Sequence, residues 1–339
     1  MRGFVIFLKN IFNKLINVYK LIVDTRRSLN PLSSKKIFNQ LDIKIKEIRP
    51  EEETLEEYFN TRNFIGEYKV TKDWEYYDSL NEWQLSYSSN IFADSTIRLF
   101  LPGDCKRVVV FFPGSITSAN TVITNNNSNF SLREYCEENN LGLAVWDWPL
   151  QGERLSEALY EELGGYVFAE REYSRILGLF GTSIWAEYIK EAEFCLGQLH
   201  KLNANKVEFD VAGWSQGAYF AYFSPFLGYP IRKVISAGSC ASISDLISSG
   251  KSYVHGYFYY PDNYSPLLDI KSVTQNIIDK KINLSIISGE KDRGCLRTTI
   301  EDLKKIFREE DSIAKLLVTK NEGHFFAGEI KKAFLQEIS

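Results

Sequence analysis

The stretch KVEFDVAGWSQG, residues 206–217, joins a buried strand to a turn that holds one serine between two glycines. Small residues two positions before and two positions after Ser215 let neighbouring backbone pass without a clash. A G-x-S-x-G turn between a strand and a helix exposes a serine hydroxyl as a nucleophile. The alternative is a tight turn that contains a serine by chance, and the rest of the chain decides between the two.

A helix is expected to begin at Gln216, directly after this turn. The N-terminus of a helix carries a partial positive charge, which here points toward Ser215. The backbone N–H of Gln216 is then placed to donate a hydrogen bond to an oxyanion that develops on a bound carbonyl group. The stretch therefore predicts a nucleophile and one oxyanion donor at neighbouring positions.

The chain around this stretch alternates between strand-like and helix-like blocks. KRVVVFFPG, residues 106–114, is a continuous apolar run typical of a strand buried on both faces. The alternation predicts an α/β protein with a mostly parallel sheet and helices on both faces, whose ligand lies at the carboxyl ends of the strands. Further strands are expected at 83–89, 95–102, 141–148, 206–214, 232–239, 281–289 and 313–320, and helices at 131–140, 182–202 and 327–338.

A serine nucleophile needs a base, and the chain has only three histidines. His200 lies in the polar end of a long predicted helix and is expected to be a solvated surface residue. His255 lies in an aromatic loop, where it either contacts substrate or packs. His324 follows the last strand, where the chain order Ser…Asp…His requires the base. We therefore expect His324 to be the base.

The base in turn needs a carboxylate to orient it. The segment LSIISGEKD, residues 284–292, ends a strand and carries Glu290 and Asp292 in the turn that follows. Both carboxylates have the alternative of a surface ion pair with Lys291 or Arg293. The strand-Gly-x-x-Asp spacing favours Asp292 over Glu290.

The second oxyanion donor is expected in the loop after the strand at 106–114. Gly114 permits close approach of the backbone, and the next N–H groups are those of Ser115 and Ile116. We expect Ser115 to be the donor, with Ile116 as the neighbouring alternative and a plain turn as the alternative without function.

From about residue 85 to the C-terminus, the chain resembles α/β-hydrolase-fold serine esterases of the dienelactone-hydrolase-like and acetyl-esterase-like branches. The matching motifs are PGS at 113–115, WDWPLQGER at 146–154, GWSQG at 213–217, GEKD at 289–292 and GH at 323–324.

This resemblance implies the α/β-hydrolase fold, a Ser215–Asp292–His324 triad, and a wall beside the site that Asp147, Gly152 and Arg154 shape. The chain departs from the family pattern at two places. Ala218 stands where many members carry glycine, and the oxyanion loop lacks the usual His-Gly.

Contacts with substrate are expected from Trp214, Arg154 and His255. Two segments are candidates to roof the site. Residues 155–182, between the 146–154 block and the long predicted helix, are rich in Gly, Tyr and Phe, and residues 245–268 follow the strand after the Ser215 turn, where lids are often inserted. Packed loop aromatics are the alternative interpretation of both segments.

Composition excludes several classes of protein. The net charge of −4 over 339 residues would repel phosphate, so we expect no nucleic-acid partner. Five dispersed cysteines without a C-x-x-C pair argue against a disulfide framework and a zinc site, and favour a cytoplasmic protein with reduced thiols. Neither a metal nor a cofactor is implied.

Residues 1–62 are expected to form an N-terminal helical extension and linker, before a hydrolase domain at 63–339. Within residues 1–27, apolar residues follow helical spacing and basic residues supply the opposite face. Such a helix packs on its own domain, mediates homo-oligomerisation or lies on an anionic membrane surface.

The leading expectation is a serine hydrolase that cleaves a carboxylic ester of an acylated or small-molecule substrate. A deacetylase, a thioesterase, an acyltransferase and a serine peptidase use the same site, so the fold and the triad leave them open. The second class is a non-catalytic protein with a hydrolase fold that serves in membrane tethering or assembly. A phosphate or dinucleotide site is excluded, because GWSQG lacks the Walker lysine and is not G-x-G-x-x-G.

Overall fold

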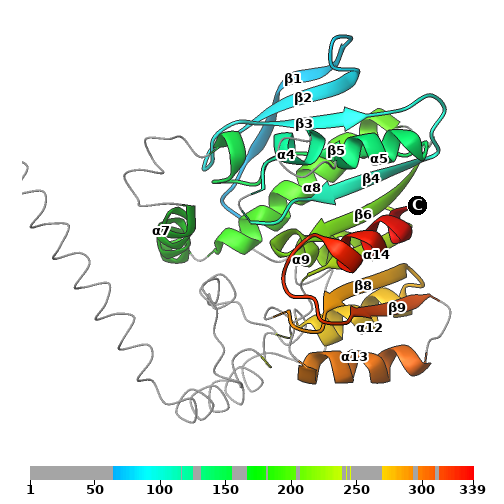
Figure 1. The fold of residues 1–339 in the computed structure, drawn as a ribbon. Coiled ribbons are helices and arrows are strands. Elements are labelled where there is room, and N and C mark those ends of the chain that lie inside the picture. Colours follow the sequence, from blue (N-terminus) through cyan, green and yellow to red (C-terminus); the bar gives the residue numbers. More distant parts are fainter. Residues whose placement is uncertain are drawn as a thin grey trace, which may run out of the picture. The chain divides into compact units, whose positions relative to one another are not determined.

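One mixed sheet organises the described part of the protein, in the order β1-β2-β3-β5-β4-β6-β7-β8-β9 (Figure 1). Strands β1 to β3 pair antiparallel and β3 joins β5 antiparallel, whereas the pairs from β5 to β9 are all parallel. The strands are β1 Tyr68–Tyr77, β2 Glu82–Ser89, β3 Ser95–Phe100, β4 Arg107–Phe112, β5 Gly142–Val145, β6 Glu208–Trp214, β7 Lys233–Ala237, β8 Asn283–Gly289 and β9 Ala314–Thr319.

The structure is a computed structural model, and all the residues that it describes fall within one unit of the chain. These residues are 64–115, 117–124, 131–154, 166–180, 182–203, 207–238, 242, 245, 269–292, 297–309 and 313–339. The predicted extension at 1–62 and nearly all of the predicted lid at 245–268 lie outside them.

Helices pack on both faces of the sheet, as the alternating pattern predicts. The apolar side chains of α4, α5 and α14 join one buried cluster, and those of α7, α8, α9, α12 and α13 join the other. These helices are α4 Ala119–Ile123, α5 Leu132–Glu138, α7 Tyr166–Leu179, α8 Ile184–Asn203, α9 Gln216–Phe223, α12 Ile270–Asp279, α13 Arg297–Glu309 and α14 Gly328–Ile338, with short 3₁₀ turns at Gly152–Arg154 and Ser224–Phe226.

Strand β4 explains why the sheet needs two helical layers. Its alternate residues Val108, Val110 and Phe112 enter one cluster, while Val109 and Phe111 enter the other. All five side chains are buried, so neither face of the strand meets water. A continuous apolar run is what such a central strand requires.

Neither strand β1 nor a helix within the segment 155–182 was expected from the sequence. Strand β1, Tyr68–Tyr77, was not predicted, because it is an edge strand and most of its side chains are partly or fully exposed. The segment 155–182, for which a lid and a packed aromatic loop were the two interpretations, has α7, a helix of 14 residues, as the main part of its described residues. Ala169 and Leu177 of α7 are buried in the core cluster that also holds α8.

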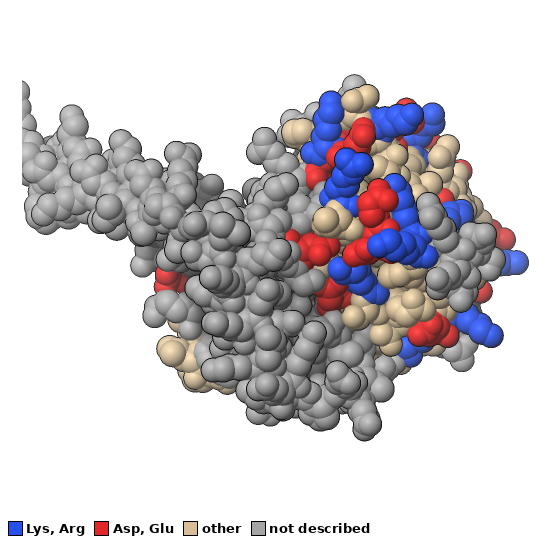
Figure 2. Space-filling model, turned by 90° about the horizontal axis from the view of Figure 1, so that it is seen from below, with Lys and Arg blue, Asp and Glu red and all other residues tan. Residues whose placement is uncertain are grey.

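The surface on the side of α13 carries mixed charges. Figure 2 views the protein from below, where α13 lies in Figure 1, and shows Lys and Arg interspersed with Asp and Glu. On α13 itself, Lys304 pairs with Glu301 at 3.0 Å and Lys305 with Asp302 at 2.9 Å. In the described residues, no helix is both long and apolar enough to cross a bilayer.

The closing helix α14 is fastened to the sheet by Glu337. Its Oε2 accepts hydrogen bonds from Lys233 Nζ on β7 and Ser285 Oγ on β8, both at 2.7 Å, and Lys315 Nζ on β9 lies 3.2 Å from Oε1. Partial burial raises the pKa of Glu337, but the hydrogen bonds from Lys233 and Ser285 outweigh burial and hold this pKa below its usual value.

A group with a lowered pKa stabilises the fold above its unfolded pKa, about 4.3 for Glu, and loses this effect as the pH falls through the folded value. We expect Glu337→Gln to lower the free energy of unfolding at pH 7 by about 1 kcal/mol, because water partly screens this charged cluster. The difference from the original protein should shrink below about pH 4, where the glutamate is protonated in both states. Denaturant unfolding at pH 7 and pH 3 measures it. Glu329→Gln, on the exposed side of α14, is the control, and an equal loss in both variants would contradict the role of Glu337.

Candidate active site

Ser215 stands at the junction of β6 and α9 with an unusual backbone conformation. Its φ is 54° and its ψ is −116°, and its N–H donates to Ala237 O at 2.8 Å. A Cβ at Gly213 would lie 2.2 Å from Gly217 O, and one at Gly217 would lie 2.0 Å from Phe112 O. Both glycines are therefore required for the turn to close, which is the arrangement that the G-x-S-x-G pattern predicts.

Three side chains predicted from different strand ends meet in one row. The hydroxyl of Ser215 lies 2.8 Å from His324 Nε2. On the other side of the ring, His324 Nδ1 lies 2.9 Å from Asp292 Oδ2 and 3.1 Å from Asp292 Oδ1. Asp292 is 3% exposed, whereas the His324 side chain is 40% exposed. The carboxylate is thus shielded and the imidazole is open to a ligand.

The loops after β8 and β9 are joined by Glu322, which brings Asp292 and His324 together. Lys291 N donates to Glu322 O at 2.8 Å, and a Cβ at Gly289 would lie 2.4 Å from that same oxygen. The carboxylate of Glu322 accepts from the N–H groups of Glu329 and Ile330 at 2.8 and 3.0 Å, at the start of α14. Gly289 is therefore needed for the close approach of the two loops.

The alternative acid and the other histidines lie elsewhere. The Glu290 carboxylate accepts from Asn321 N at 3.2 Å, whereas His324 Nδ1 contacts the two carboxylate oxygens of Asp292. His200 was expected to be solvated, and this expectation is wrong: it is partly buried and stacks on Tyr229 with ring centroids 5.1 Å apart. Burial lowers the pKa of His200 because water no longer stabilises its charged form. His255 lies outside the described residues.

The loop after β4 passes directly beside the nucleophile turn. A Cβ at Gly114 would lie 3.1 Å from Trp214 O and 3.3 Å from Ser215 Cβ, so glycine allows the close approach that was predicted. Within the described residues, the backbone N–H groups of Ser115 and Gln216 have no hydrogen-bond partner. Two unpaired N–H groups flanking Ser215 have the chemistry of an oxyanion hole. The alternative donor, Ile116, is not among the described residues.

Trp214 packs against the imidazole that faces Ser215. The indole and the His324 ring are stacked with centroids 5.1 Å apart, and Phe326 lies 5.1 Å from the indole on another side. Gly238 has a φ of 69°, and a Cβ there would lie 2.4 Å from the indole ring. Trp214 and Phe326 are half-buried, whereas the ring of Phe325 is 75% exposed. Trp214 therefore supports His324, and Phe325 presents an apolar surface next to it.

Arg154 is held in the protein interior by groups that use most of its donors. Its Nη1 is paired with the Glu191 carboxylate and donates to Asp147 O at 3.1 Å, and its Nε donates to Ala93 O at 2.9 Å. Burial disfavours the charge of Arg154, but Glu191 outweighs burial and keeps the pKa of Arg154 above its usual value. The structure thus places the predicted substrate contact Arg154 as a buried link between segments.

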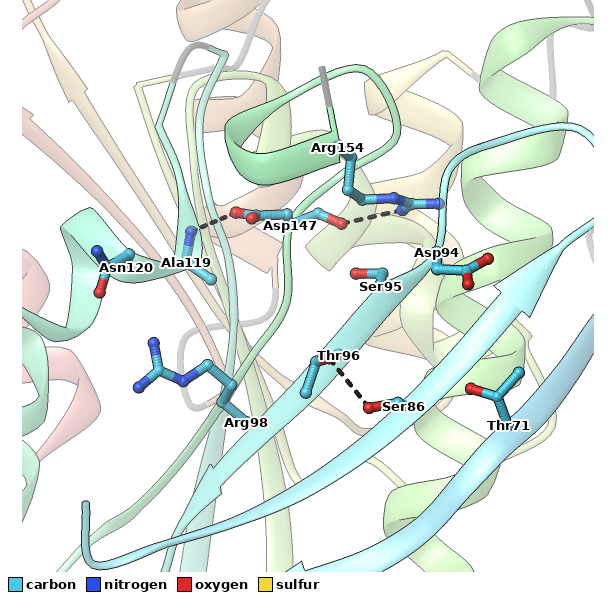
Figure 3. A pocket seen from close by; sticks show the side chains of 10 residues that line it. All are labelled: Thr71, Ser86, Asp94, Ser95, Thr96, Arg98, Ala119, Asn120, Asp147 and Arg154. Carbon is cyan, nitrogen blue, oxygen red and sulfur yellow. Dashed lines mark hydrogen bonds between the residues drawn. The ribbon is translucent and has the colours of Figure 1, made fainter. Parts of the chain in front are cut away.

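Arg154 also lines a polar cavity of about 290 Å³ with Asp147 and side chains of β2, β3 and α4. Figure 3 shows Asp147 between two partners: its carboxylate faces the backbone N–H of Ala119 and its carbonyl oxygen faces the Arg154 guanidinium. A Cβ at Gly152 would lie 2.5 Å from the Asp147 carboxylate. These three residues of the 146–154 block are thus packed as one wall.

Sequence reasoning missed the buried polar groups beneath this wall. Gln151 and Glu170 are 2% and 0% exposed, and both are bonded to the side chain of Gln216. The only sequence signal for such a network is a polar residue inside an otherwise apolar stretch. Among the residues that the structure describes, no three His, Cys, Asp or Glu side chains gather as metal ligands would.

The chain matches no protein-family model and no curated protein. S-formylglutathione hydrolase from Agrobacterium tumefaciens resembles it in structure with a TM-score of 0.50 at 13% identity, over 78% of this chain and 97% of that one. Dienelactone hydrolase from Anabaena variabilis resembles it with a TM-score of 0.44 at 14% identity, over 76% of this chain and 94% of that one. Dipeptidyl peptidase 4 from Porphyromonas gingivalis gives 0.47 at 13% identity, over 82% of this chain and 35% of that one.

The sheet order and the likeness to the Agrobacterium tumefaciens enzyme show that the chain has the α/β-hydrolase fold. Hydrolases and a peptidase are thus among the structures that it resembles. The row of hydroxyl, imidazole and carboxylate at the carboxyl ends of β6, β8 and β9 is suited chemically to nucleophilic attack on a carbonyl carbon.

Proposed function

We propose that this protein is a serine hydrolase that cleaves a carboxylic ester through an acyl-enzyme. One observation carries the proposal: Ser215 Oγ, the His324 ring and the Asp292 carboxylate form a continuous row with separations of 2.8 and 2.9 Å. Such a row at the end of three strands is the arrangement that activates a serine for acyl transfer.

In the proposed reaction, Ser215 Oγ attacks the ester carbonyl carbon and its proton passes to His324 Nε2. Asp292 accepts the Nδ1–H of the ring, which fixes the tautomer and stabilises the imidazolium. The N–H groups of Ser115 and Gln216 donate to the oxyanion. His324 then returns the proton to the leaving alcohol, and a water molecule activated by the same ring releases the acid.

The class of hydrolase also draws support from the structural comparison. S-formylglutathione hydrolase, at the TM-score of 0.50, is named for hydrolysis of an acyl compound, and the proposal carries that reaction class to this chain. Phe325 supplies an exposed apolar ring next to His324, which is suited to contact with the acyl part of an ester. No cofactor enters the proposed steps.

A fluorophosphonate probe tests the proposal directly, because it phosphonylates only an activated serine. We expect intact-protein mass spectrometry to show one adduct on the original chain and none on Ser215→Ala. Turnover of p-nitrophenyl acetate and longer p-nitrophenyl esters should follow the fraction of unlabelled protein. Ser224→Ala, which removes the hydroxyl bonded to Phe220 O at the far end of α9, is the matched control and should be labelled normally.

Absence of an adduct on the folded original chain would overturn the proposal and favour a non-catalytic role in tethering or assembly. An adduct without any ester turnover would instead direct the substrate screen to amide, thioester and acyl-transfer reactions.

We further propose that the protein is cytoplasmic and that residues 1–27, which lie outside the described part, mediate either self-association or contact with a membrane surface. Their basic and apolar pattern supports this part of the proposal. Removing them should leave ester turnover unchanged and alter sedimentation or binding to anionic vesicles. Unchanged behaviour in both measurements would contradict it.

A further inference from the structure

The side chain of Gln216 lies at the centre of a buried hydrogen-bond network beside the nucleophile. Its Oε1 accepts from Ser115 Oγ and from Gln151 Nε2, both at 3.0 Å. Its Nε2 donates to Glu170 Oε1 on α7 at 3.3 Å. One carboxamide therefore connects the loop after β4, the 146–154 block and helix α7. Gln216 itself is 7% exposed, so these bonds are shielded from water.

The loop that carries Ser115 is also held at both of its ends. Trp148 Nε1 donates to Pro113 O at 3.1 Å before the loop, and the Asp147 carboxylate accepts from Ala119 N at 2.5 Å after it. Between these two anchors, the described polar side-chain contact of the loop with the nucleophile turn is the one from Ser115 to Gln216. Within the loop, Thr117 N donates to Gly114 O at 3.1 Å, so a turn bond and the bond from Ser115 Oγ to the Gln216 carboxamide together hold the Gly114–Ser115 peptide.

The orientation of that carboxamide depends on α7. A carboxamide has one acceptor oxygen and one donor nitrogen, and only Glu170 distinguishes its two ends, because a carboxylate accepts and does not donate. Glu170 Oε1 also lies 3.0 Å from the Tyr188 hydroxyl, which is 3.0 Å from Pro149 O. Glu170 and Tyr188 are both fully buried, so α7 and α8 hold the acceptor at a fixed place.

We propose that the Gln216 side chain is a positioning residue for the oxyanion hole, and that α7, through Glu170, sets its orientation. The inference rests on the proposed function and deepens it. Gln216 would serve twice: its backbone N–H touches the oxyanion, and its side chain aims the second donor, the Ser115 N–H. The helix expected to be a lid is then a fixed part of the catalytic structure.

The expected effect appears in kcat, because the oxyanion donors act on the transition state more than on bound substrate. We expect Gln216→Leu, which keeps the backbone N–H, to lower kcat for p-nitrophenyl acetate by about 10- to 100-fold, with little change in KM. Ser115→Ala, which keeps its N–H and loses only the hydroxyl, should give a smaller loss in the same direction. Rates are expressed per serine labelled by the fluorophosphonate, so that unfolded protein does not count.

A second readout separates positioning from general loss of structure. A trifluoromethyl ketone binds as a hemiketal after Ser215 Oγ adds to its carbonyl carbon, and the new oxyanion occupies the same hole. Its affinity should fall in parallel with kcat in Gln216→Leu and Ser115→Ala. Gln275→Leu and Ser224→Ala are matched controls that lose one hydrogen bond elsewhere and should change neither value.

The role of α7 is tested by a pair of variants at one position. Glu170→Gln keeps one oxygen that accepts from Gln216 Nε2 and adds a donor nitrogen, so kcat should fall less than in Glu170→Ala. Glu170→Ala removes the acceptor, and kcat should fall toward that of Gln216→Leu. The double variant Glu170→Ala with Gln216→Leu should be no worse than Gln216→Leu alone, because both changes break the same contact.

Three outcomes would overturn the inference while the proposed function stands: unchanged kcat per labelled serine in Gln216→Leu, equal losses in the two Glu170 variants, or additive losses in the double variant. If Gln216→Leu does not fold, the Ser115 and Glu170 variants decide. If the original protein is not labelled by the fluorophosphonate and hydrolyses no ester, the proposed function is overturned, and this inference is overturned with it.

Discussion

Ser215→Ala is expected to lower kcat for p-nitrophenyl acetate by about 10⁶-fold, the scale found when the nucleophile of a serine hydrolase is removed. The alanine keeps the Cβ at a φ of 54° and loses only the hydroxyl that lies 2.8 Å from His324 Nε2. The backbone contacts that close the turn involve Gly213, Gly217 and the bond from residue 215 N to Ala237 O, so they are unaffected. The variant should therefore fold normally and be inactive.

Steady-state turnover and thermal unfolding of the two proteins measure this expectation. Ser224→Ala is again the matched control, since its hydroxyl is fully buried and lies just after α9, at the end of that helix opposite Ser215. A Ser215→Ala protein that retains about a hundredth or more of the original rate would mean that another group is the nucleophile. If Ser215→Ala does not fold, Ser215→Cys takes its place in the test, because it keeps a side chain of similar shape and should still react with electrophilic probes.

The central strands were predictable because a strand with apolar side chains on both faces has to be buried on both faces. KRVVVFFPG has apolar side chains on both faces, and the structure places them in both buried clusters on either side of β4. Gly213 and Gly217, on either side of Ser215, were equally predictable, since an added Cβ would lie 2.2 Å from Gly217 O at the first position and 2.0 Å from Phe112 O at the second. The local sequence is enough to predict an element where contacts between residues close along the chain determine its structure.

Elements at the edge of the domain were not predictable in the same way. Strand β1 contains polar side chains such as Lys69, Lys72 and Asp73, whose pattern indicates exposure to water but does not indicate a strand. Its strand structure comes from pairing with β2. Helix α7 contains Gly178 and several aromatic residues, which suggested a loop, but burial of Ala169 and Leu177 against the core overrides that local pattern.

The site shows the same division. Each of the three residues was predicted from the strand that precedes it: Ser215 from β6, Asp292 from β8 and His324 from β9. The relation between them is set by tertiary contacts, such as the bond from Lys291 N to Glu322 O that joins two loops. Gln151 and Glu170 carried no motif at all, because a hydrogen-bond partner that is distant along the chain leaves no local signature.

Asp292→Asn is expected to lower kcat by about four orders of magnitude. The two oxygens of Asp292 lie 2.9 and 3.1 Å from His324 Nδ1, so the carboxylate accepts the proton on that nitrogen and leaves Nε2 free to accept from Ser215. An asparagine can present an N–H to Nδ1, which places the ring proton on Nε2. In that tautomer the ring donates toward the serine hydroxyl and no longer acts as its base. KM should change little, since the substrate does not touch this 3% exposed carboxylate.

Glu290→Gln is the control that the chain itself offers, two residues away in the same turn. Its side chain keeps an oxygen to accept from Asn321 N, now 3.2 Å from the Glu290 carboxylate, so turnover should equal that of the original protein. Steady-state kinetics of both variants with p-nitrophenyl acetate compare the two acids directly. A loss in Glu290→Gln together with full activity in Asp292→Asn would mean that the acid is misassigned. Equal, modest losses in both would mean that the turn after β8 supports the fold and that no carboxylate orients His324.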